Sequence, residues 1–167
     1  YGGSKVPSDW TVTATPQGVT GQDAISGPGE ASSTTLKPGE YLLSESANPY
    51  GWTLKTDWVC ESGTGSEGEW NFDQKTGILS LGLKAKVTCT IVNKDLPGSV
   101  SWSKVDDDQK PLEGSKWSLT GPDTMDLPDN CVPDVPDPVE GRYCVVNGSS
   151  FVVGGLKWGD YVLTETD

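Results

Sequence analysis

The stretch GEYLLSE (residues 39–45) returns later in the chain as GDYVLTE (residues 159–165), within the longer phrases LKPGEYLLSES and LKWGDYVLTET. In each stretch a tyrosine, a leucine and a glutamate occupy every second position: Tyr41, Leu43 and Glu45 in the first, and Tyr161, Leu163 and Glu165 in the second. Side chains of an extended chain point to opposite faces in turn, so these three side chains share one face. The period of two predicts a β-strand in both places. It also predicts that Glu45 and Glu165 point inward with the apolar side chains of their own strands.

A second pair of matching segments lies upstream of each phrase. WTVTA (residues 10–14) resembles WSLTG (residues 117–121), so two elements recur in the same order. The 21 glycines, 12 prolines and short apolar runs between turn residues are typical of an all-β protein. We therefore predict two tandem immunoglobulin-like, prealbumin- or transthyretin-like β-sandwiches. They span residues 1–97 and 98–167, with Leu96-Pro97-Gly98 as a tight junction, and each is expected to lack a terminal strand.

The charge balance excludes several classes of partner. The chain has 24 acidic and 12 basic side chains and a net charge of -12. Binding to phosphate backbones requires clustered Lys and Arg, so nucleic acid is not an expected partner, and the same charge disfavours an anionic membrane surface. No apolar run is long enough for a membrane span, and the first residues do not have the pattern of a signal peptide.

The four cysteines favour disulfides over a metal site. None of them lies in a C-x-x-C motif, and the chain has no histidine. A zinc site would need all four cysteines from both halves of the chain. Pairing by position within each half predicts the disulfides Cys60–Cys89 and Cys131–Cys144. Disulfides place the protein in an oxidising, extracellular setting.

The second half resembles a known family. VSWSKVDDDQKPLEGSKWSLTG (residues 100–121) followed by FVVGGLKWGDYVLTET (residues 151–166) is similar to the CNA-B type, SpaA-like isopeptide-forming domains of Gram-positive pilins and adhesins. LKPGEYLLSESANPYGW (residues 36–52) and CTIVNKD (residues 89–95) resemble the same prealbumin-like family in a diverged form. The resemblance implies a cell-wall-attached surface protein or pilus, with neighbouring domains or pilin subunits as partners.

The resemblance also implies roles for individual residues. In the second domain Lys104 matches the reactive lysine and Glu165 the catalytic glutamate. In the first domain Glu45 matches the catalytic glutamate and Asn93 the electrophile. Each domain then contains only one of its two reactants. The Asn or Asp partner of Lys104 is expected beyond Asp167. The lysine partner of Asn93 is expected before Tyr1, because Lys104 lies 13 residues before Trp117 and the same count back from Trp10 passes Tyr1. Lys5 is the alternative lysine within the chain.

This chemistry needs these residue types. A protonated amine is no nucleophile, and a carboxamide is a poor electrophile. Burial lowers the pKa of a lysine and raises that of a glutamate, so that a neutral amine can attack while a protonated acid activates the carbonyl. A glutamate inside a strand is then an acid kept neutral by its surroundings.

The sequence therefore predicts a structural and adhesive module, not a turnover enzyme, and no cofactor or metal. The alternative is a glycan-binding or host-protein-binding module that uses loop tryptophans, with Trp52 and Trp158 as candidates. Two acidic segments, residues 106–108 and 123–137, are read as solvated turns with calcium binding as the alternative. Neither has the spaced ligands of an EF-hand loop.

Overall fold

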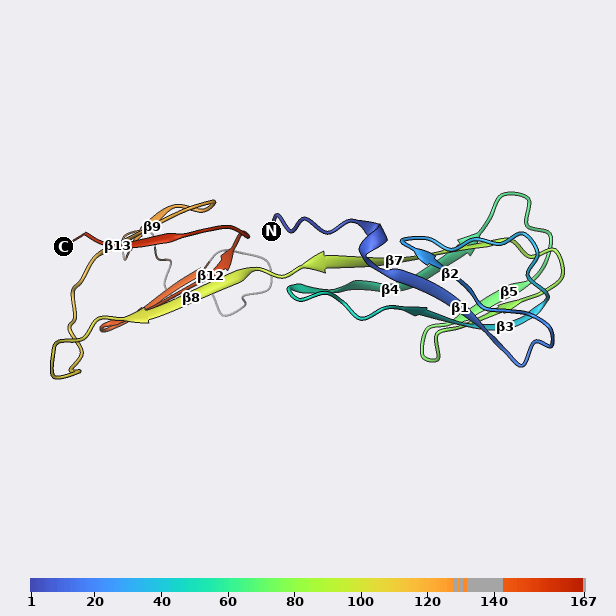
Figure 1. The fold of residues 1–167 in the computed structure, drawn as a ribbon, viewed down its shortest axis with the longest axis horizontal. Helices are drawn as coiled ribbons and strands as arrows, with labels where there is room; N and C mark the ends of the chain where they lie inside the picture. Colours follow the sequence, from blue (N-terminus) through green and yellow to red (C-terminus); the bar gives the residue numbers. More distant parts are fainter. Residues whose placement is uncertain (128, 130, 132–142, 167) are drawn as a thin grey trace. The chain divides into compact units, whose positions relative to one another are not determined.

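The computed structural model describes residues 1–127, 129, 131 and 143–166. The chain forms two compact units. The N-terminal unit is Ser4–Lys94, and the C-terminal unit is Asp95–Asp167 together with Tyr1–Gly3. Apart from one short 3-10 helix, η1 (Pro7–Asp9), the regular elements of the described residues are strands, which confirms the all-β prediction (Figure 1).

The N-terminal unit contains two sheets. A five-stranded sheet has the order β2-β1-β3-β6-β5, and a two-stranded sheet pairs β4 with β7. The strands are β1 (Thr11–Gln17), β2 (Ile25–Pro28), β3 (Gly39–Glu45), β4 (Trp52–Ser62), β5 (Trp70–Asp73), β6 (Ile78–Leu81) and β7 (Val87–Asp95). β3, the strand of the first repeated stretch, lies between β1 and β6 and pairs antiparallel with both.

Alternation along β3 explains its place in the sheet. Tyr41 is fully buried, Leu43 and Glu45 are half-buried, and the residues between them are exposed. The interior of this unit also contains Trp10, Ala14 and Leu79. The face predicted to point inward is therefore the inner face of the sheet.

The C-terminal unit is a sandwich of two three-stranded sheets, with the orders β10-β9-β13 and β11-β12-β8. The strands are β8 (Gly98–Ser103), β9 (Trp117–Thr120), β10 (Met125–Leu127), β11 (Tyr143–Asn147), β12 (Ser150–Leu156) and β13 (Val162–Glu165). Its core draws side chains from both sheets: Leu119, Met125, Leu127, Cys144, Phe151, Val153 and Leu156. Trp102 stacks on Phe151 with ring centroids 5.2 Å apart, which ties β8 into this core.

Four strands were not expected from the sequence: β2, β5, β10 and β11. β2 lies in a segment rich in turn residues, and β10 and β11 flank a segment rich in Pro and Asp. All four are short, and each pairs with the strand next to it in the chain. Local pattern is a poor guide to such strands, because pairing partners decide them.

The repeat is real, but one part of its predicted alignment is wrong by two residues. Glu45 lies opposite Val12 in the β1–β3 pair, and Glu165 lies opposite Trp117 in the β9–β13 pair. Val12 therefore corresponds to Trp117, and Trp10 lies two residues before that position. Because side chains alternate, a shift of two keeps the same face inward, and a tryptophan could be placed at either position without disturbing the core.

Candidate functional site

Lys104 and Glu165 meet in the C-terminal unit. Lys104 follows the end of β8 and Glu165 ends β13, so the two residues come from different sheets of the sandwich. Lys104 Nζ donates to Glu165 Oε2 at 2.7 Å. The side chains are 32% and 36% exposed, so water reaches both charges and screens their attraction.

Glu45 and Asn93 meet in the N-terminal unit. Glu45 ends β3 and Asn93 lies in β7, again in different sheets. Asn93 Nδ2 donates to Glu45 Oε1 at 2.8 Å, and both residues are half-buried. Asn93 Oδ1 is buried and accepts no hydrogen bond from any described residue. A buried acceptor without a donor is costly, so this oxygen is a place where a further donor would be stabilising.

The structure thus joins the four residues into two pairs, each of which bridges two sheets and contains one glutamate. The first pair has an amine beside a carboxylate, and the second has a carboxamide beside a carboxylate. Lys5, the alternative lysine for Asn93, instead lies 3.4 Å from Asp9 Oδ1. Neither pair by itself holds both an amine and a carbonyl electrophile.

The turn before each glutamate strand has the same construction in both units. Tyr41 OH donates to the carbonyl of Lys37 at 2.6 Å, and Tyr161 OH donates to the carbonyl of Lys157 at 3.1 Å. A tyrosine bonded to a carbonyl a few residues upstream resembles the tyrosine corner of immunoglobulin-type sandwiches. Burial raises the pKa of Tyr41 above the usual value for tyrosine. The repeated letters L-K-x-G-x-Y are the sequence signal of this corner, although sequence reasoning did not assign it.

The glycine of the corner is required by conformation and by space. Gly39 has φ 150° and Gly159 has φ 146°, a region that residues with a Cβ rarely adopt. A Cβ on Gly39 would come within 2.5 Å of Val19 Cγ2, and one on Gly159 within 2.5 Å of Pro122 Cγ. The β1–β2 loop therefore packs directly against the backbone of the first corner, and the β9–β10 loop against that of the second.

Both predicted disulfides are confirmed. Cys60 is bonded to Cys89 across β4 and β7, and Cys131 is bonded to Cys144 of β11. Each bond lies within one unit. The first joins the two strands of the small sheet that carries Asn93.

The two candidate ligand-binding tryptophans have different environments. Trp52 packs edge-on against the buried Trp10 with ring centroids 5.2 Å apart, and it is itself half-buried. Trp158 is 41% exposed, and its indole N–H donates to the carbonyl of Leu96 at 3.0 Å. Trp158 is therefore the more exposed of the two candidates, and Trp52 packs against a buried tryptophan.

Carboxylates of the acidic turn at residues 106–108 bond a residue that follows closely in the chain. Asp106 accepts from the backbone N–H of Lys110 at 2.7 Å, and Asp108 forms an ion pair with the same lysine's ammonium at 3.1 Å. Among the described residues, no cluster of three or more His, Cys, Asp or Glu side chains is arranged to hold a metal ion. Most of the second acidic segment, residues 123–137, lies outside the described residues.

Comparison with known proteins agrees with this architecture. A profile of a prealbumin-like fold domain of the SpaA type matches residues 1–91, a span that nearly coincides with the N-terminal unit. No curated protein and no solved structure matches the chain. In the described residues there is no helix with the length and apolar character of a membrane span. Because the matched segment is more than half of the chain, the protein belongs to the family of SpaA-type prealbumin-like fold domains.

Proposed function

We propose that this chain is a load-bearing structural module of a bacterial pilin or adhesin, attached to the cell wall, whose sandwiches are reinforced by disulfides and by lysine to asparagine or aspartate isopeptide bonds. The observation that carries the proposal is the pairing of each repeated glutamate with a reactant of the right type. Glu165 contacts Lys104, and Glu45 contacts Asn93. Neighbouring domains or subunits of the same surface protein are the proposed partners.

The N-terminal pair combines a carboxamide electrophile with a carboxyl group that can act as its acid. A lysine amine attacks Cγ of Asn93, the C–N bond to the side-chain nitrogen breaks, and ammonia leaves with a proton relayed by Glu45. Protonated Glu45 would donate to the carbonyl oxygen once the side-chain amide of Asn93 flips and exchanges the positions of Nδ2 and Oδ1. In its present orientation the amide places Nδ2 on the glutamate and leaves Oδ1 without a partner.

The C-terminal pair would hold the nucleophile. The carboxylate of Glu165 is placed to accept the proton that the ammonium of Lys104 must lose before it can attack. With both side chains about one-third exposed, the pair needs a covering strand to exclude water. A strand that carries Asn or Asp and lies across β8 and β13 would supply both the cover and the electrophile.

The benefit of such bonds is mechanical. A covalent link between strands of opposite sheets limits the unfolded ensemble as a disulfide does, which is worth several kcal/mol. It also prevents the sheets from separating under load. The reaction occurs once in each domain, so we expect no turnover of an external substrate.

The test is mass spectrometry of peptides from the mature protein isolated from its own cell surface. We expect the peptide containing Asn93 to be joined to a lysine peptide, with a loss of about 17 Da for ammonia. The peptide containing Lys104 is expected to be joined to one containing Asn or Asp. Recovery of both peptides at their unmodified masses would show that the isopeptide bonds do not form. Glu45→Ala and Glu165→Ala variants, isolated in the same way, provide the control in which the linked peptides are lost.

A further inference from the structure

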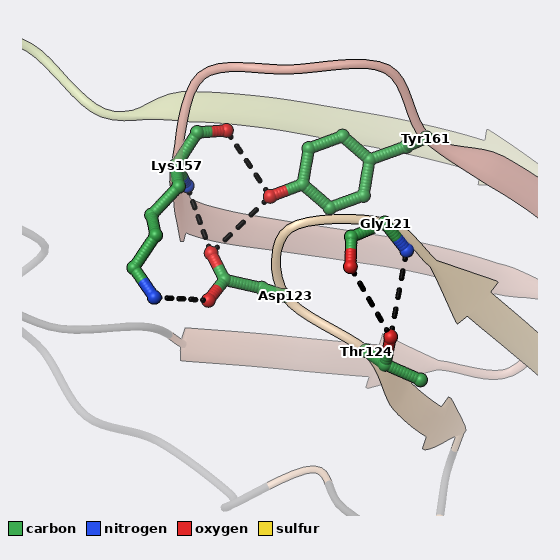
Figure 2. A network of polar contacts seen from close by, with 5 residues as sticks. All are labelled: Gly121, Asp123, Thr124, Lys157 and Tyr161. Atoms are coloured by element: carbon green, nitrogen blue, oxygen red, sulfur yellow. Dashed lines mark hydrogen bonds and ion pairs between the residues drawn. The ribbon is translucent and has the colours of Figure 1, made fainter. Parts of the chain in front are cut away.

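The lysine of each repeated phrase is held by a side chain from another part of its unit. The backbone N–H of Lys37 donates to Gln22 Oε1 at 3.0 Å. The backbone N–H of Lys157 donates to Asp123 Oδ2 at 2.8 Å (Figure 2). Gln22 lies in the β1–β2 loop and Asp123 in the β9–β10 loop. Since β1, β2 and β3 correspond to β9, β10 and β13, this is the same contact in both units.

The two contacts differ in their chemistry. In the N-terminal unit Lys37 Nζ donates to the carbonyls of Thr20 and Gly21, at 2.9 and 2.8 Å, so the loop is held by neutral acceptors. In the C-terminal unit Lys157 Nζ lies 3.1 Å from Asp123 Oδ1. Tyr161 OH also contacts Asp123 Oδ2, at 3.2 Å. One carboxylate, only 11% exposed, therefore binds the backbone and the ammonium of Lys157 and the hydroxyl of Tyr161.

These contacts are placed to control the strand that ends in the glutamate. Tyr161 immediately precedes β13, and its hydroxyl bonds both Asp123 and the carbonyl of Lys157. All the residues of β13, from Val162 to Glu165, pair with β9. The corner therefore sets where the strand that ends in Glu165 begins.

We propose that Gln22 and Asp123 are positioning residues that hold the corner before each glutamate strand, and that the carboxylate makes the corner of the C-terminal unit sensitive to acid while the carboxamide leaves that of the N-terminal unit insensitive. The part of this inference that treats Glu45 and Glu165 as the acid–base groups of isopeptide formation rests on the proposed function. The difference between the two corners stands without it.

The direction of the acid response follows from the groups that face Asp123. The backbone N–H of Lys157 is the main cause that lowers the pKa of Asp123, and the ammonium of Lys157 and the hydroxyl of Tyr161 act in the same direction. A carboxyl whose pKa is lowered by folding stabilises the folded state above its unfolded pKa of about 3.9. That stability is lost as the pH falls through the lower, folded pKa. Gln22 has no proton to gain in this range.

The experiment is an NMR titration of the chain from pH 7 to pH 2.5. We expect the amide of Lys157 to shift together with the carboxyl carbon of Asp123, with one shared midpoint below about 3.9. The amide of Lys37 is expected to stay flat. Gln22→Glu should make the Lys37 amide titrate, and Asp123→Asn should flatten the Lys157 response. Similar titration of both lysine amides in the unmodified chain would overturn the proposal.

Hydrogen exchange then tests whether the corner controls the strand. In Asp123→Ala the amides of β13 should exchange at least about tenfold faster at neutral pH, with those of β11 in the same unit unchanged. Asp123→Asn retains an acceptor for the Lys157 amide and should restore most of the protection. Equal acceleration in β11 and β13 would show general destabilisation and reject a positioning role. Neither measurement depends on isopeptide formation, so the mass-spectrometric test can fail while this one succeeds, and the reverse.

Discussion

Lys104 Nζ and Glu165 Oε2 lie 2.7 Å apart although their residues are 61 positions apart in the chain. The contact joins the end of β8 to the end of β13 and so links the two sheets of the C-terminal unit. In the isolated chain it is an ion pair about one-third exposed to water. The ion pair therefore stabilises the folded unit much less than a covalent bond between the same two residues would.

As an ion pair, the contact should contribute little. We expect Lys104→Met and Glu165→Gln each to lower the free energy of unfolding by about 1 kcal/mol or less, because solvent screens the charges. A double-mutant cycle by urea unfolding at low and high salt measures the coupling, which should fall as salt is added. A coupling well above that limit and insensitive to salt would contradict the description of the pair as solvent-screened.

The buried hydroxyl of Tyr41 should matter more. Tyr41→Phe removes the donor to the carbonyl of Lys37, and the free energy of unfolding should fall by about 1 kcal/mol. Tyr50→Phe is the matched control, because Tyr50 is 99% exposed. Equal urea midpoints for the two variants would mean that the corner hydrogen bond adds nothing to stability.

The glycine of the corner should not tolerate a side chain. Gly39→Ala introduces a Cβ within 2.5 Å of Val19 at φ 150°. Gly18→Ala is the control, since Gly18 also has a positive φ of 72° but no atom within 4 Å of its Cβ position. The backbone penalty is about 1 to 2 kcal/mol for Gly18→Ala and about 1 to 3 kcal/mol for Gly39→Ala, which should lose a further 1 kcal/mol or more through overpacking. Thermal unfolding in which Gly18→Ala is the less stable variant would count against the packing argument.

The Cys60–Cys89 disulfide should be worth about 3 to 4 kcal/mol, as estimated from loop-closure entropy for cysteines separated by 29 residues. The double variant Cys60→Ser, Cys89→Ser should show this loss in urea unfolding. Cys131–Cys144, separated by 13 residues, should contribute slightly less, about 3 kcal/mol. Since β4 and β7 form a sheet of only two strands, we also expect faster amide exchange in β7 of the first double variant. Unchanged exchange there would show that strand pairing alone holds β7.

Asp73 should report a local acid response in the turn after β5. It accepts from the backbone N–H of Lys75 at 2.9 Å, and this bond is the main cause that lowers the pKa of Asp73. Its contribution to stability should be present above about pH 3.9 and be lost as the pH falls through the lower folded value. A carboxyl-carbon titration should give a midpoint below 3.9, with the Lys75 amide following it. In Asp73→Asn the Lys75 amide should no longer respond to acid.

Much of the fold could be predicted from local pattern. Alternation in the repeated stretches identified β3 and β13, and the position of the cysteines in each half identified both disulfides. The strands that were missed, β2, β5, β10 and β11, are short and depend on their partners. The predicted equivalence of Trp10 and Trp117 was wrong by two residues, because sequence likeness does not report which residue a strand places opposite which.

The sequence by itself determined the glycine and tyrosine positions of the repeated corner, the inward face of β3 and the types of residue available for chemistry; Glu165, predicted to point inward, is exposed. These follow from local rules: the side-chain period of a strand and the conformational freedom of glycine. Only the tertiary structure decided that Glu165 meets Lys104, that Glu45 meets Asn93, and that Gln22 and Asp123 hold the two corners. Each of these contacts crosses between sheets or reaches from a loop to a turn. The packing of distant elements, and not the local pattern of any one segment, brings such atoms together.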